Sequence, residues 1–97
     1  MLIRIVRMTF KPEAVDTFLS VFNEHKDQIR SFPGCSHLEL QQDYHQPHVF
    51  ATYSYWEDDS ALDKYRHSDL FKGVWAKTKI HFSDKPIAFS HRRLQTL

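Results

Sequence analysis

Two stretches of this chain, residues 2–10 and 49–56, carry apolar or aromatic side chains at both odd and even positions. Successive side chains of a strand point to opposite faces, so each stretch predicts a strand that is covered on both sides. In the first stretch, Val6 lies on one face and Ile3 with Ile5 on the other. A sheet built around two such strands needs a layer of structure on each of its faces.

The segments around these strands predict the rest of the sheet and its first helix. Apolar residues recur at helical spacing from Pro12 to about Arg30, and Pro33-Gly34 then ends the helix and turns the chain. Residues 35–44 alternate weakly and carry more polar side chains, which is typical of a strand at a sheet edge. A last mixed strand, also suited to an edge, is expected from Ile87 to about Leu94.

The stretch after the second central strand predicts a helix in two parts. Asp58 is placed to cap its start, and Ser60 with Asp63 offers an alternative capping box. The helix is expected to break near residues 68–69 and to restart with an inner stripe at helical spacing. That stripe consists of Phe71, Val74, Trp75, Thr78 and Phe82.

The predicted order β-α-β-β-α-β is that of the ferredoxin-like α+β fold, with an antiparallel four-stranded sheet. In this topology residues 2–10 and 49–56 form the central strands, which agrees with their apolar character. The chain is short enough for a single domain over residues 1–97. Its helices can cover only one face of the sheet, so we expect a second copy to cover the other face in a homodimer.

Composition restricts the classes of partner and cofactor. The formal net charge of +1 gives no indication of nucleic acid or a membrane surface as a partner. Cys35 is the only cysteine, so no intramolecular disulfide can form, and the seven histidines lack the spacing of a metal site. The first residues alternate charged and apolar side chains, unlike a signal peptide, and no apolar run is long enough to span a membrane. We therefore expect a cytoplasmic protein without a metal or cofactor.

Several short motifs give the chain a resemblance to a known family. The motifs are a helix that opens with Pro12, the Pro33-Gly34 turn, the Trp-Glu-Asp-Asp-Ser-Ala-Leu run at residues 56–62, and Ser-Asp-Leu-Phe at residues 68–71. Over nearly its whole length the chain resembles the antibiotic biosynthesis monooxygenase (ABM) family of the dimeric α+β barrel superfamily. The resemblance implies a β-barrel at a dimer interface and a pocket in each subunit between helices and sheet.

The resemblance also implies a function. Several members of the family oxygenate phenols or quinols without metal or flavin: the substrate loses a proton, and its anion passes an electron directly to O₂. It therefore implies a cofactor-independent monooxygenase whose substrate is a quinol or another small phenolic or polycyclic aromatic compound. A non-catalytic dimeric barrel that binds a small aromatic ligand is the alternative. Heme degradation, known in other members, is disfavoured because the Asn, Trp and His expected for it are replaced by Arg7, Tyr65 and Trp75.

Two aromatic residues are candidates for orienting the substrate. Tyr65 stands where many relatives have His, and its hydroxyl is expected to donate a hydrogen bond to a substrate oxygen; a core tyrosine with its hydroxyl at the surface is the structural alternative. The indole N–H of Trp56 is a second candidate donor, against a purely structural role in packing the Ala61-Leu62 turn.

Two further residues are candidates for charge and proton transfer. Arg7 either binds an anionic ligand in the pocket or pairs across the dimer, depending on which face of its strand looks into the pocket. His37 is a candidate base, since its ordinary pKa is ~6.5, against a solvated histidine on an edge strand. His67 and His81 are the alternatives from the helices. Trp75, Phe71 and Tyr53 are expected to bind the substrate ring.

Overall fold

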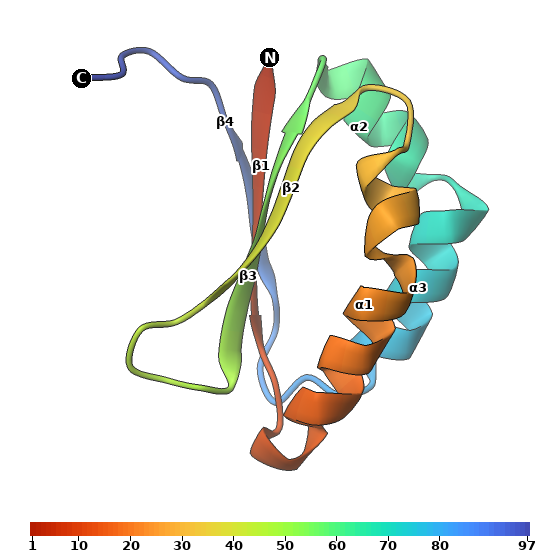
Figure 1. Cartoon of the computed structure of the whole chain (residues 1–97), viewed down its shortest axis with the longest axis vertical. Helices are drawn as coiled ribbons and strands as arrows, with labels where there is room; N and C mark the ends of the chain where they lie inside the picture. The colour runs from red at the N-terminus through yellow and green to blue at the C-terminus, as the bar shows by residue number, and fades with distance from the viewer.

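A computed structural model describes all 97 residues, and it has the predicted order of elements. The elements are β1 (Leu2–Thr9), the 3₁₀ turn η1 (Pro12–Ala14), α1 (Val15–Arg30), β2 (Cys35–Gln42), β3 (Val49–Trp56), α2 (Asp59–Arg66), α3 (Asp69–Lys79) and β4 (Ile87–His91). The helices lie together on one side of the sheet, and the other side carries no helix (Figure 1). None of the helices is long and apolar enough to cross a membrane.

The sheet is antiparallel, with the strand order β2-β3-β1-β4. The prediction that residues 2–10 and 49–56 form the central strands is confirmed. Figure 1 shows the sheet as one layer and the helices as a second. We call the face without helices the outer face. Its central rows contain Ile3, Ile5 and Arg7 of β1, Ala51, Tyr53 and Tyr55 of β3, and Ile87, Phe89 and His91 of β4.

Several predicted boundaries differ from the structure, and β1 ends at Thr9 rather than at Phe10. β2 ends at Gln42 and β4 at His91, so both edge strands are shorter than expected. The helical stripe was predicted to reach Phe82, but this is wrong because α3 ends at Lys79. Phe82 instead forms an isolated bridge with Phe10, and the two rings pack with their centroids 5.3 Å apart. The segment that follows α3, and not the helix itself, therefore brings Phe82 into contact with Phe10.

Side-chain caps begin both parts of the second helix. The carboxylate of Asp58 accepts a hydrogen bond from the backbone N–H of Ala61 at 2.8 Å, so Asp58 is the cap of α2. The Ser68 hydroxyl accepts from the N–H of Phe71 at 3.1 Å and donates to the carbonyl of Tyr65 at 2.6 Å. Ser68 therefore ends one helix and starts the next, which fixes the change of direction between α2 and α3.

Gly34 occupies a position that no larger residue fits. Its φ of +90° lies in the region that side chains disfavour, and an added Cβ would lie 2.5 Å from the Cβ of Ala61. The turn before β2 therefore packs directly against α2. The carbonyl of Gly34 also accepts a hydrogen bond from the N–H of Glu57 at 2.8 Å, which connects this turn to the end of β3.

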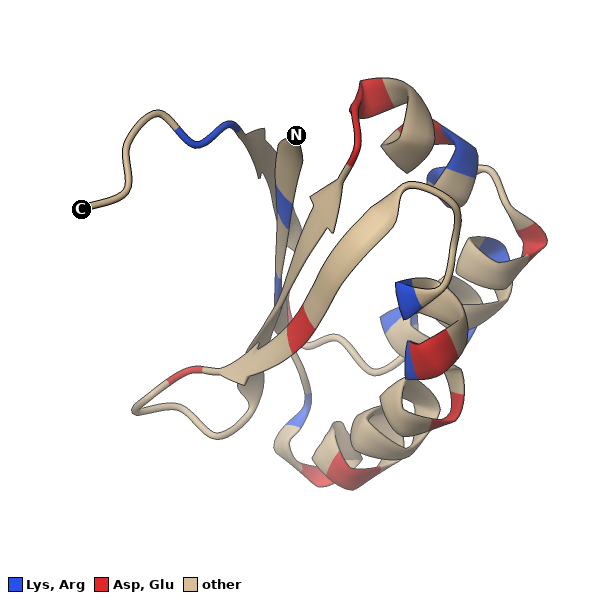
Figure 2. Cartoon of the chain, turned by 45° about the horizontal axis from the view of Figure 1, so that its top comes forward, with Lys and Arg blue, Asp and Glu red and all other residues tan.

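The core fills one end of the space between helices and sheet. Four buried residues, Met8, Phe10, Phe18 and Phe50, form its centre. The rings of Phe10 and Phe18 stack with centroids 4.1 Å apart. Acidic and basic residues are interspersed along the helices, whereas the strands carry few of them (Figure 2). The rest of the space between the layers is incompletely filled, and it is there that the candidate site lies.

Candidate functional site

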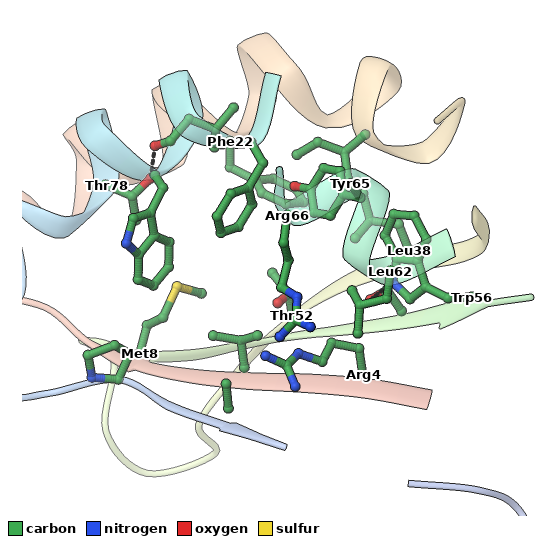
Figure 3. Close-up of a pocket in the computed structure, with 18 of the residues that line it drawn as sticks. Arg4, Met8, Phe22, Leu38, Thr52, Trp56, Leu62, Tyr65, Arg66 and Thr78 are labelled. Atoms are coloured by element: carbon green, nitrogen blue, oxygen red, sulfur yellow. Dashed lines mark hydrogen bonds between the residues drawn. The ribbon is translucent and has the colours of Figure 1, made fainter. Parts of the chain in front are cut away.

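A cavity of about 230 Å³ separates the helices from the sheet. Its floor is formed by the strand face that looks toward the helices, mainly Arg4, Val6 and Met8 of β1 and Thr52, Ser54 and Trp56 of β3. Its roof is formed by α1, α2 and α3, including Phe22, Leu62, Tyr65, Arg66, Phe71, Val74 and Trp75. Figure 3 shows these side chains converging from sheet and helices on the same space.

Four aromatic residues form a continuous series along this cavity, which we call the aromatic wall. Trp56 stacks on Tyr65 with ring centroids 4.8 Å apart, Tyr65 meets Phe71 at 5.2 Å, and Phe71 stacks on Trp75 at 5.7 Å. The series connects the end of β3 with α2 and α3. Such a surface suits a flat aromatic ligand, because offset-stacked and edge-to-face ring contacts add to the free energy of apolar burial.

Tyr65 brings a free polar group to the wall. Its hydroxyl makes no hydrogen bond within the chain, and its oxygen is not among the fully buried polar atoms without a partner, so the oxygen keeps some accessible surface on a residue that lines the cavity. Burial raises the pKa of Tyr65 well above its usual value, and the nearby Cys35 adds to the effect. The hydroxyl is therefore neutral at ordinary pH, and it is available to donate a hydrogen bond to a ligand.

Trp56 is fixed by hydrogen bonding as well as by packing. Its side chain is 1% exposed, and its indole N–H donates to the Ser54 hydroxyl at 3.0 Å. The N–H is thus already satisfied, and the ring, which stacks on Tyr65, closes one side of the cavity. The hydroxyls of Ser54 and Thr52 make the floor beside it partly polar.

Two arginines also line the cavity, and neither was a candidate from sequence. Arg4 comes from β1 and donates a hydrogen bond to the Ser90 hydroxyl at 3.1 Å, and Arg66 comes from α2. Burial lowers the pKa of Arg4, as does the positive charge of Arg66, whereas Asp59 raises it. The sequence held one indication of a role for Arg4, because Arg4 shares its strand face with apolar Val6. The same indication applied to Arg7, which shares the opposite face with apolar Ile5.

No His, Asp, Glu, Cys or Lys side chain lines this cavity. Its ionisable groups are Tyr65, Arg4 and Arg66, none of which is a base at neutral pH. Elsewhere in the structure no group of three or more His, Cys, Asp or Glu side chains is placed to hold a metal ion. The cavity therefore offers aromatic surface, hydrogen-bond donors and positive charge, and it offers no proton acceptor of its own.

The structure brings together four of the predicted residues, Tyr65, Trp56, Phe71 and Trp75, and places the other three on the outer face. Arg7 forms an ion pair with Asp43 at 3.1 Å, and His37 lies 2.6 Å from a carboxylate oxygen of Glu39. The ring of Tyr53 meets that of His37 edge to face at 6.2 Å. These three lie on the face opposite the cavity because strand side chains alternate between faces.

The two histidines considered on the helix side do not line the cavity either. His67 is exposed at the end of α2, where its Nδ1 lies 2.8 Å from the carbonyl of Asp63. His81 follows α3, and its backbone carbonyl accepts a hydrogen bond from the N–H of Lys11.

The solved structures most informative for comparison share the fold over almost the whole chain. An antibiotic biosynthesis monooxygenase superposes with a TM-score of 0.92 at 25% identity, covering 98% of this chain and 100% of its own. A conserved protein from Methanosarcina mazei Go1 has a TM-score of 0.90 at 22% identity, and PA3566 from Pseudomonas aeruginosa has 0.85 at 22%. Each of these two covers 97% of this chain and 94% of its own.

Comparison of sequences gives two results. No protein with a curated description matches the chain. The sequence model of the family described as antibiotic biosynthesis monooxygenase matches residues 1–77, which span everything from β1 to the end of the aromatic wall. The chain therefore belongs to the antibiotic biosynthesis monooxygenase family.

Proposed function

We propose that this protein is a monooxygenase that oxidises a small phenol or quinol with O₂ in the cavity between its helices and sheet, without a metal or flavin. The observation that carries the proposal is a cavity of about 230 Å³ bounded by the aromatic wall. An apolar cavity of ~150 Å³ holds benzene, so this one suits about two fused rings better than a larger polycyclic system. Ordinary drug-sized sites begin at ~300 Å³.

The proposed reaction needs no external reductant. The phenolate form of the substrate gives one electron to O₂, and the resulting radical and superoxide combine at a ring carbon that carries hydrogen, opposite the oxygen in a simple phenol or next to it in a quinol. Proton uptake gives a hydroperoxide at that carbon, and loss of water leaves a quinone. One oxygen atom enters the product and the other leaves as water, while the C–H and O–H hydrogens of the phenol supply both hydrogens of that water.

The residues of the cavity have separate roles in this scheme. Tyr65 donates a hydrogen bond to the substrate oxygen, which favours the phenolate because hydrogen bonds to a charged form stabilise it. Trp56, Phe71 and Trp75 hold the ring and reduce the access of water. Because no side chain in the cavity accepts a proton at neutral pH, the substrate must be acidic enough to lose its proton to solvent.

Oxygen uptake tests the proposal. A panel of one- and two-ring hydroquinones and naphthols is added to the protein under air, and O₂ consumption is measured against the uncatalysed background. We expect consumption of one O₂ per quinone formed, with one atom of ¹⁸O₂ in the product. Tyr65→Phe should slow this reaction, whereas Tyr44→Phe, which alters a side chain that is 95% exposed, should not.

A second candidate function is ligand binding without catalysis. The specific observation in its favour is that no proton acceptor lines the cavity. If members of the panel raise the melting temperature but none increases O₂ consumption, this binding function replaces the monooxygenase. Uptake of O₂ above background that depends on Tyr65 excludes it.

We also propose that a second copy of the chain covers the outer face. Ile87 is 58% exposed and Phe89 is 37% exposed there, beside Ile5 and Tyr53 of the central strands. This is an apolar and aromatic patch on a sheet that carries no helix on that side. Sedimentation at micromolar concentration should give the mass of a dimer, and Ile5→Asp should give a monomer. A wild-type monomer would contradict this assignment.

A further inference from the structure

The oxygenation proposed above requires aromatic surface and a hydrogen-bond donor, but it does not require two arginines. Arg4 and Arg66 nevertheless line the same cavity, one from β1 and the other from α2. In Figure 3 their guanidinium groups point toward one another in the space between sheet and helix. Two cations that face each other beside an apolar cavity repel one another, so the arrangement is unfavourable unless an anion joins them.

The chain itself does not supply that anion. The side chain of Arg4 donates its hydrogen bond to a neutral hydroxyl, that of Ser90, and no carboxylate lies within ion-pairing distance of Arg4. Asp59 acts on Arg4 only from a greater distance. Arg66 approaches Asp63 to 3.5 Å, but both side chains are partly exposed to solvent, at 38% and 58%, so this pair is weak. Both guanidinium groups therefore keep donors free for a ligand.

We propose that the ligand of this cavity is an aromatic acid, whose carboxylate binds between Arg4 and Arg66 while its rings lie along the aromatic wall. Guanidinium and carboxylate groups match in shape and form paired, charge-assisted hydrogen bonds. Tyr65 and Arg66 both line the cavity from α2, so a phenolic oxygen and the acid group of one ligand would both lie at the part of the cavity that α2 covers. The inference deepens the proposed function, since it names the class of substrate for the same site.

Binding of a matched pair of probes tests the inference. 2-Naphthoate and 2-naphthamide have nearly the same shape and do not react with O₂, and only the first is charged. Isothermal titration calorimetry measures both affinities for the wild-type protein and for Arg4→Gln, Arg66→Gln and Arg7→Gln. Arg7 is the matched control because it lies on the outer face, 3.1 Å from Asp43 and away from the cavity.

We expect wild-type protein to bind naphthoate at least about tenfold more tightly than naphthamide, because charge-assisted hydrogen bonds are the strong ones. Arg4→Gln and Arg66→Gln should each remove most of this preference while leaving the affinity for naphthamide unchanged. Arg7→Gln should retain it. Added salt should weaken wild-type binding of naphthoate and leave that of naphthamide unaffected, a result that does not depend on any variant being folded.

The possible failures are distinguishable. Equal affinities for the two probes, or a preference that survives both cavity substitutions, would overturn the inference and leave the oxygenase proposal in place. A preference for naphthoate without O₂ consumption on any hydroxynaphthoate would overturn the oxygenase proposal and support the acid-binding site. Binding of neither probe would overturn the acid-binding inference, and O₂ uptake with the phenol panel would then decide the oxygenase proposal separately.

Discussion

The substitution Tyr65→Phe distinguishes a contribution of the Tyr65 hydroxyl to ligand binding from a contribution to folding stability. The substitution removes one oxygen atom and keeps the ring that stacks on Trp56 at 4.8 Å and meets Phe32 at 5.4 Å. A hydroxyl that is hydrogen-bonded inside a protein contributes about 0.5–1.5 kcal/mol to stability. The Tyr65 hydroxyl has no partner within the chain, so we expect the free energy of unfolding to change by less than ~0.5 kcal/mol.

The effect on ligand should be larger than the effect on folding. If the hydroxyl donates to a neutral ligand oxygen, its loss costs about 0.5–1.5 kcal/mol, and if it donates to a phenolate it costs about 1.5–3 kcal/mol. The second range corresponds to a fall in kcat/KM of about tenfold to a hundredfold. Urea denaturation measures the stability, and O₂ uptake with the best substrate of the panel measures kcat/KM. Tyr44→Phe, an exposed site, is the control for both assays.

Two results would refute this reasoning. A loss of more than ~1 kcal/mol in unfolding free energy would show that the hydroxyl is bonded within the protein, since that is the ordinary value of such a bond. An unchanged kcat/KM would show that the hydroxyl does not reach the substrate, and the role of Tyr65 would then be limited to its ring.

Three further predictions follow from individual contacts. Ser54→Ala should lower the unfolding free energy by about 1–3 kcal/mol in denaturation experiments, because the buried indole N–H of Trp56 loses its acceptor. The control Ser20→Ala, on the exposed side of α1, should have little effect. Gly34→Ala should lower the melting temperature and cost about 2 kcal/mol or more, since the new methyl meets Ala61 at 2.5 Å and φ is +90°; equal stability would contradict the packing described. The raised pKa of Tyr65 means that this group ionises in the unfolded chain near pH ~10 but remains protonated in the folded one, so stability should fall as pH rises above ~10, and less steeply in Tyr65→Phe.

The order of elements and the central strands follow from the sequence alone. Residues 2–10 and 49–56 carry apolar side chains at both odd and even positions, so both faces of these strands must be covered. This pattern is visible in the sequence without coordinates. The Asp58 cap and the turn at Gly34 follow from local chemistry, because a short acidic side chain before a helix and a glycine after one serve backbone groups a few residues away. The aromatic residues of the site, Tyr65 and Trp75 among them, could be predicted from helical spacing and from the family resemblance.

Which face of the sheet the helices cover was decided only by the tertiary structure. The two faces of β1 look alike in sequence, since each combines one arginine with aliphatic residues, and no local rule chooses between them. Packing of α1 and α3 onto the face of Met8 places Arg4 inside and Arg7 outside, and the same choice carries His37 and Tyr53 to the outer face. The positive end of the cavity depends on that choice together with the rotation of α2 that brings in Arg66, and both arise from contacts between residues far apart in the chain.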